Sequence, residues 1–225
     1  MRARRGRILG WTVVVAYAGL LAWSSISALH TSDRGARAAA AAAAAPQRFI
    51  DAWVRSREAT FVAVGTYERH SGVSGATLSS EDVVAQRPPR RLHRQLGGVE
   101  GQDDGRLIVC PAPPAGAEED AAPCQLGATG GESYADSVRR ERAGLRSILL
   151  GDAPLYSVDE PRAGCFDLVQ RRIDPRAPFG VRASFCFDGG SGAVRASRVH
   201  HEGGTVEVVV MAAIRTEVTD ADLTP

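Results

Sequence analysis

The chain has 225 residues and a net charge of +1, and it contains neither lysine nor asparagine, so all 27 basic residues are arginines. The lack of lysine excludes a Walker A phosphate loop and Schiff-base chemistry, and the lack of asparagine excludes N-glycosylation. Four arginines precede the first apolar run and the rest of the chain is slightly acidic. Nucleic-acid binding is therefore not expected, because such domains are normally basic.

The first element is a run of 22 uncharged residues, 8–29, which is long enough to cross a bilayer. Trp11 and Trp23 lie near its ends, where indole rings favour the membrane interface. The arginines before the run place residues 1–7 in the cytoplasm by the positive-inside rule. We expect an uncleaved transmembrane signal-anchor, and hence a single-pass protein of the cell membrane.

A cleaved signal peptide is the alternative interpretation of the same run. Ser25, Ser27 and Ala28 are small residues near a position where cleavage would occur. The apolar run is, however, longer than the apolar region of about 7–15 residues in most signal peptides. The anchor is therefore the favoured prediction.

Residues 30–45 follow as an alanine-rich tether that includes eight consecutive alanines, 38–45. A helix that continues into the next element is the alternative, because alanine is the best helix former. Residues 46–225 are then expected to form one extracytoplasmic domain, since about 180 residues suffice for a single core.

Two helices are predicted in this domain, over 46–57 and 134–150. In the first, Pro46 suits a helix start, and Phe49, Ile50, Trp53 and Val54 form one apolar stripe. Eight strands are predicted between and after the helices by alternation and by glycine-rich turns. They are 60–70, 77–86, 91–96, 105–110, 165–173, 181–187, 193–200 and 205–214.

The four cysteines all follow the apolar run, so an oxidising compartment and two disulfides are expected. A zinc site is not favoured because no C-x-x-C pair exists. The pairs nearest in sequence are Cys110–Cys124 and Cys165–Cys186. In the second pair, alternation places both cysteines on one face of neighbouring strands and the flanking aromatic residues on the other.

The order of helix, strands, helix, strands indicates an α+β fold. We expect a curved antiparallel β-sheet, a half-barrel, with the two helices on its concave face. In the last strand, residues 206, 208, 210, 212 and 214 are expected to share one face.

Three stretches of the domain resemble a known family. They are the helix followed by Ala59-Thr60-Phe61-Val62, the segment from Pro88 to Arg94 followed by Leu107-Ile108-Val109-Cys110-Pro111, and Phe187-Asp188 with the glycine turns that lead to Val218–Leu223. Together they are similar to the LolA/LolB-like superfamily of extracytoplasmic half-barrels, and most similar to the N-terminal domain of RseB/MucB-type regulators. The resemblance implies an apolar cavity that holds acyl chains or senses a protein or lipid.

The first functional hypothesis is a membrane-tethered domain that binds an apolar ligand, such as lipid or lipoprotein acyl chains. The predicted cavity residues are Trp53, Phe61, Phe185, Phe187, Val206, Val208 and Val210. The alternative is a sensory or regulatory domain that binds an envelope protein of the anti-sigma-factor type. Its predicted contact residues are Arg90, Arg91 and Arg94. No nucleophile–base pair is evident, so we expect no enzyme activity, no cofactor and no metal.

Overall fold

The computed structural model describes residues 39–112, 124–127, 131–175 and 177–225. Residues 45–225 form one compact unit. Within the described residues no helix is both long and apolar enough to cross a membrane. The predicted transmembrane segment, 8–29, and the loop residues 113–123 lie outside them.

Eleven strands form one antiparallel sheet in the order β6-β5-β4-β3-β2-β1-β11-β10-β9-β8-β7, with β6 and β7 at its edges. Their bounds are β1 Phe61–His70, β2 Thr77–Arg87, β3 Arg90–Gln95, β4 Gly98–Asp103, β5 Arg106–Cys110, β6 Gln125–Leu126, β7 Tyr156–Arg162, β8 Cys165–Gln170, β9 Arg182–Phe187, β10 Val194–His200 and β11 Val206–Arg215. The α+β class and the antiparallel sheet are confirmed. The sheet has three more strands than predicted, namely β4, β6 and β7.

Two long helices accompany the sheet. The N-terminal helix covers residues 39–58, and α2 covers Tyr134–Leu150, as predicted. The predicted start of the first helix at Pro46 is wrong, because the preceding alanines are already helical. Ser133 caps α2 by accepting a hydrogen bond from the Asp136 backbone N–H.

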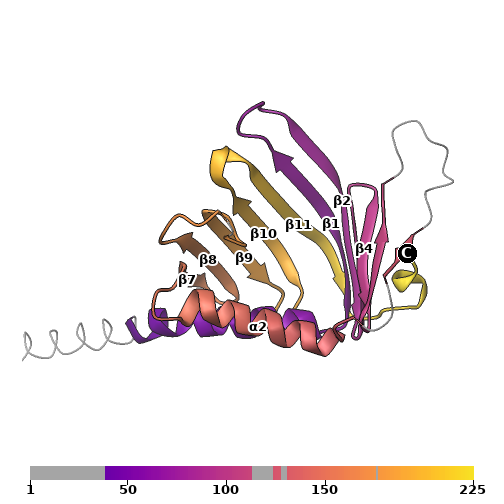
Figure 1. The fold of residues 1–225 in the computed structure, drawn as a ribbon, viewed down its shortest axis with the longest axis horizontal. Helices are drawn as coiled ribbons and strands as arrows, with labels where there is room; N and C mark the ends of the chain where they lie inside the picture. The colour runs from indigo at the N-terminus through magenta and orange to yellow at the C-terminus, as the bar shows by residue number, and fades with distance from the viewer. Residues whose placement is uncertain (1–38, 113–123, 128–130, 176) are drawn as a thin grey trace, which may run out of the picture. The chain divides into compact units, whose positions relative to one another are not determined.

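The two helices lie antiparallel to each other at one end of the strands (Figure 1). Arg146 of α2 reaches Gln47 of the N-terminal helix, and Glu141, earlier on α2, reaches Arg57, later on the N-terminal helix. Their apolar sides meet strands β7, β8 and β9 in the main core. This core includes Phe49, Ile50, Leu145, Leu149, Tyr156, Phe166, Leu168 and Phe185.

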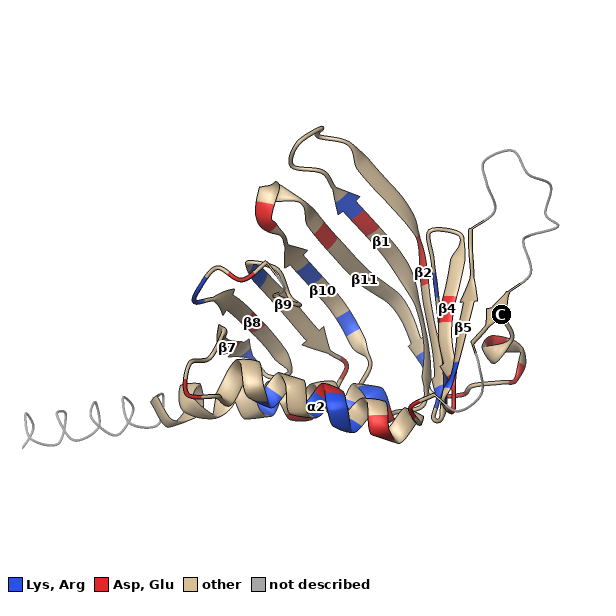
Figure 2. Ribbon diagram, viewed as in Figure 1, with Lys and Arg blue, Asp and Glu red and all other residues tan. Residues whose placement is uncertain are grey.

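The opposite face of the sheet is covered by the C-terminal segment over β1–β3. Leu223, in the short 3-10 helix η2 (Ala221–Leu223), is fully buried against Val62 and Ala85. Arg87 and Arg215 form ion pairs with Asp220 and Asp222 of this segment. Basic strand ends and acidic tail residues therefore gather at the same end of the sheet (Figure 2).

Both predicted disulfides are present. Cys110 is bonded to Cys124, and Cys165 is bonded to Cys186. The second pair joins directly opposite residues of β8 and β9, and the neighbouring Phe166 and Phe185 point into the core. The alternation argument from the sequence is thus confirmed at this site.

A β-bulge changes which side chains of β11 lie on each face of the sheet. Val64 pairs with Ala213 and Gly65 pairs with Met211, which leaves Ala212 without a partner on β1. A side chain at Gly65 would approach the carbonyl oxygen of Val210, since a Cβ atom there would lie 2.1 Å from it. The extra residue moves every preceding side chain of β11 to the other face of the sheet. The prediction that alternate residues of 206–214 share one face is therefore wrong.

Candidate functional site: an apolar cavity between the helices and the sheet

A cavity of about 590 Å³ lies between the N-terminal helix, α2 and the loop before β9. Its size falls within the range of about 300–1,000 Å³ that is typical of small-molecule sites. It is lined by Trp53, Arg57, Arg91, Glu141, Gly144, Leu145, Ile148, Pro178 and Phe179. A second, smaller cavity of about 100 Å³ continues toward the sheet and shares Trp53, Arg57 and Arg91 with the first.

The apolar wall of the cavity is built on an aromatic cluster. The ring of Trp53 packs edge-on against Phe179 and Phe185, with centroids 5.5 and 5.6 Å apart. Phe49 is fully buried and contacts these three rings and also those of Phe166 and Phe187. Edge-to-face aromatic pairs stabilise a fixed arrangement, so this wall is held in shape by the core.

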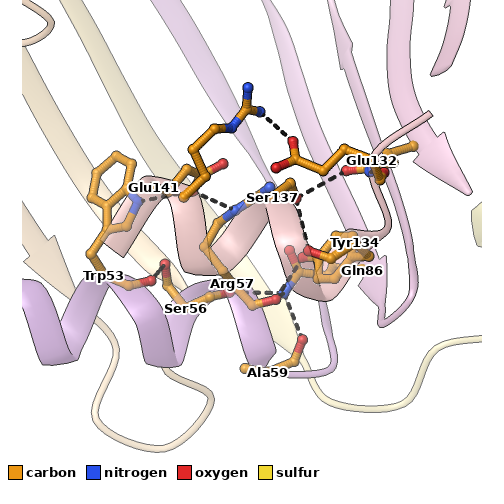
Figure 3. A network of polar contacts seen from close by, with 11 residues as sticks. Trp53, Ser56, Arg57, Ala59, Gln86, Glu132, Tyr134, Ser137 and Glu141 are labelled. Carbon is orange, nitrogen blue, oxygen red and sulfur yellow. Dashed lines mark hydrogen bonds and ion pairs between the residues drawn. The ribbon is translucent and has the colours of Figure 1, made fainter. Parts of the chain in front are cut away.

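Glu141 of α2 lies at the polar side of the cavity (Figure 3). Its Oε2 atom accepts hydrogen bonds from Arg57 Nε at 3.0 Å and from Trp53 Nε1 at 3.3 Å. The guanidinium of Arg57 also lies 5.3 Å from the ring centre of Tyr134, a cation–π geometry. The charge of Arg57 is therefore compensated by the protein itself.

The C-terminal end of the N-terminal helix is fastened to the sheet by Gln86 of β2 (Figure 3). Its buried amide Nε2, which carries two hydrogens, lies 2.7–2.9 Å from the carbonyl oxygens of Ser56, Arg57 and Ala59. The Tyr134 hydroxyl also donates to the Arg57 carbonyl, at 2.6 Å. Burial raises the pKa of Tyr134, with the positive charges of Arg57 and Arg91 opposing this shift, so the phenol keeps its proton at neutral pH.

The predicted cavity residues fall into three groups. Trp53 and Phe61 line the cavities, whereas Phe185 and Phe187 pack in the core beside them. Because of the bulge in β11, Val209 and Met211 face the helix side of the sheet. The predicted residues on that strand point to the opposite face and do not line these two cavities: Val206, Val208 and Val210.

The predicted arginine patch is divided between the two faces of β3, because side chains alternate along a strand. Arg90 donates to the Leu223 carbonyl, and Arg94 donates to the carbonyls of Asp222 and Thr224. Both thus hold the C-terminal segment. Arg91 points to the other face, into the cavity.

Sequence reasoning missed Arg57, Gln86 and Glu141 as site residues. Glu141 belongs to the charged stretch 139–142 of α2, and such a stretch is typical of an exposed helix side. Gln86 is one polar residue at the end of a predicted strand. Only the structure shows that this position of β2 lies against the end of the N-terminal helix, where buried carbonyl groups need a hydrogen-bond donor.

Comparisons with known proteins identify structural similarities only. No protein-family model matches the sequence, and no curated protein matches it. The MucA/MucB complex of Pseudomonas aeruginosa is similar at 15% identity and a TM-score of 0.43, over 78% of this chain and 60% of that chain. A MucB structure is similar at 16% identity and a TM-score of 0.41, over 78% and 62%, so the chain spans less than two thirds of either.

A LolA superfamily protein from Nitrosomonas europaea is similar at 9% identity and a TM-score of 0.33, over 80% of this chain and 98% of that chain. Both groups named by the sequence resemblance, MucB-type and LolA-type proteins, are thus represented among the similar solved structures.

Proposed function

We propose that this chain is a membrane-tethered extracytoplasmic domain that binds an apolar ligand, such as lipid or lipoprotein acyl chains. The observation that carries the proposal is the cavity of about 590 Å³ between the two helices and the sheet. Leu145, Ile148 and Phe179 offer it apolar surface, and burying a chain there is favourable by about 0.8 kcal/mol for each methylene. The proposal includes an N-terminus in the cytoplasm and an anchor at residues 8–29.

Gly144 offers a direct test, because it lines the cavity from the middle of α2 and a Cβ atom there would meet no other atom within 4 Å. The substitution Gly144→Leu therefore has room at its Cβ atom, and we expect its side chain to extend into the cavity. Ala143→Leu adds a similar side chain to the neighbouring exposed position of the same helix and serves as the matched control.

The full chain would be expressed in bacterial membranes, extracted in excess detergent and measured by native mass spectrometry. We expect a lipid adduct on the unaltered chain and on Ala143→Leu, and a loss of this adduct on Gly144→Leu. An adduct that persists equally in Gly144→Leu would contradict binding in the cavity. A chain without any adduct, which also binds no added lipid, would instead favour the protein-interaction hypothesis.

The tether has its own test. An anchored chain should remain in the membrane pellet after an alkaline carbonate wash, and removal of residues 1–38 should release it. A full chain that stays in the soluble fraction would contradict the anchor, and the proposal about the cavity would be unaffected.

A further inference from the structure

Three polar residues stand in one row across the helix-facing side of the sheet. Arg91 of β3 pairs in register with Gln86 of β2 on one side and with Gln102 of β4 on the other. Directly opposite residues of paired strands point to the same face. The row therefore runs beneath the end of the N-terminal helix and the start of α2.

The two outer members of the row fasten the helices. Gln86 binds the carbonyl groups at the end of the N-terminal helix. Gln102 donates to the Glu132 carbonyl at 3.1 Å and lies 3.4 Å from the hydroxyl of Ser137, next to the start of α2. Each outer residue thus has a structural role that accounts for a polar side chain.

The central member has no such role. Arg91 lines both cavities, and within residues 39–112, 124–127, 131–175 and 177–225 it forms neither a hydrogen bond nor an ion pair. Two carboxylates act on Arg91 electrostatically, those of Glu141 and Asp82, but Glu141 is already bound by Arg57 and Trp53 and Asp82 by His93. The lining of the larger cavity thus carries two guanidinium groups against one carboxylate.

The guanidinium of Arg91 remains charged under physiological conditions. Burial, and then the positive charge of Arg57, lower its pKa to about 10, which is still well above neutral pH. The Arg91 side chain is only partly buried, and a guanidinium forms two parallel hydrogen bonds with a carboxylate or a phosphate. The cavity therefore combines apolar walls with one cation that forms no ion pair within the described residues.

We propose that Arg91 binds the anionic head group of an amphiphile whose apolar chain lies in the cavity between the helices. The head group is a carboxylate or a phosphate ester, since both fit the planar fork of the guanidinium. The chain extends from Arg91 past Trp53 toward Ile148 and Phe179. This inference rests on the proposed function and adds the chemical class of the ligand.

The test uses Trp53 as a reporter, because it lines the cavity beside Arg91. The chain has three tryptophans, so the full chain would carry Trp11→Phe and Trp23→Phe and be kept in amphipol. Quenching would be titrated with dibromostearic acid, with dibromostearyl alcohol and with the lysophosphatidate of the same acyl chain. The alcohol has the same chain without the charge.

We expect Arg91→Met to weaken the binding of the acid or the lysophosphatidate by about tenfold or more, since hydrogen bonds to charged groups contribute about 1.5–3 kcal/mol. Its affinity for the alcohol should change by less than about twofold, because the alcohol carries no charge that the guanidinium could pair with. For comparison, a tenfold change in affinity corresponds to about 1.4 kcal/mol. Arg91→Lys should keep part of the preference for the anionic probes. Arg90→Met is the matched control on the opposite face of β3 and should leave every affinity unchanged.

The outcomes are distinct. Tighter binding of the acid assigns a carboxylate head group, and tighter binding of the lysophosphatidate assigns a phosphate; both support the proposal. Equal binding of acid and alcohol, or equal effects of Arg91→Met on both, would overturn the head-group site while the cavity proposal stands. Failure of all three probes in a chain with native circular dichroism would overturn both.

Discussion

Gln86 is the residue on which the position of the N-terminal helix depends most directly. It is 1% exposed, and its amide nitrogen, with two hydrogens, lies within hydrogen-bond distance of three carbonyl groups of the helix end. In Gln86→Leu the Arg57 carbonyl keeps its hydrogen bond from Tyr134, but those of Ser56 and Ala59 lose theirs. An unsatisfied buried acceptor costs about 1–3 kcal/mol, so two of them predict a loss of about 3 kcal/mol.

The loss would be measured by urea unfolding of residues 39–225, which contain the compact unit 45–225. With a slope of about 2 kcal/mol per molar urea, the midpoint should fall by about 1.5 M. Gln102→Leu is the control: the Ser137 hydroxyl can donate to the Tyr134 carbonyl instead, and the hydrogen bond to Glu132 is exposed, so water replaces it at a cost of about 0.5 kcal/mol. Equal losses in the two variants would refute the role assigned to Gln86.

Three further predictions concern the other face and the disulfide. Leu223→Ala should cost about 3 kcal/mol, because this side chain is fully buried; an unchanged urea midpoint would contradict a packed tail. Hydrogen bonds from the Thr219 hydroxyl and backbone N–H, and then from Arg215, lower the pKa of Asp222 from 3.8 to about 2. Its stabilising effect should therefore be complete above about pH 4 and disappear toward pH 2, so Asp222→Asn should lower the melting temperature at pH 6 but not at pH 2. Replacing Cys165 and Cys186 by alanine removes a link between residues 21 apart and should lower the free energy of unfolding by about 3 kcal/mol. The difference from the unaltered chain should shrink under reducing conditions, where the unaltered chain also lacks the link.

The elements that the sequence predicted well are those with a strong local pattern. The predicted helix 134–150 matches α2 at both ends, and Ser133 caps its start. The Cys165–Cys186 pair followed from alternation around two aromatic residues. β4 was missed because its sequence, GVEGQD, has one large apolar residue and two glycines; its pairing with β3 and β5 defines it instead.

The site was less predictable because it depends on relations between strands. The bulge opposite Gly65 cannot be read from the alternating valines of β11, although it determines which of them face the helices. Arg90, Arg91 and Arg94 were predicted to form one patch, although alternation along a strand divides them between two faces. Only the contacts made in the folded sheet show that Arg90 faces the C-terminal segment whereas Arg91 faces the cavity.

The central claim is that an apolar chain lies between the two helices and the sheet. A fatty acid with a photoreactive diazirine near the end of its chain would be cross-linked to the full chain, and the adducts located by peptide mass spectrometry. The account predicts adducts on peptides that contain Trp53, Ile148 or Phe179, and their loss in Gly144→Leu. Adducts confined to residues 8–29, or to Val206, Val208 and Val210 on the opposite face of β11, would contradict it.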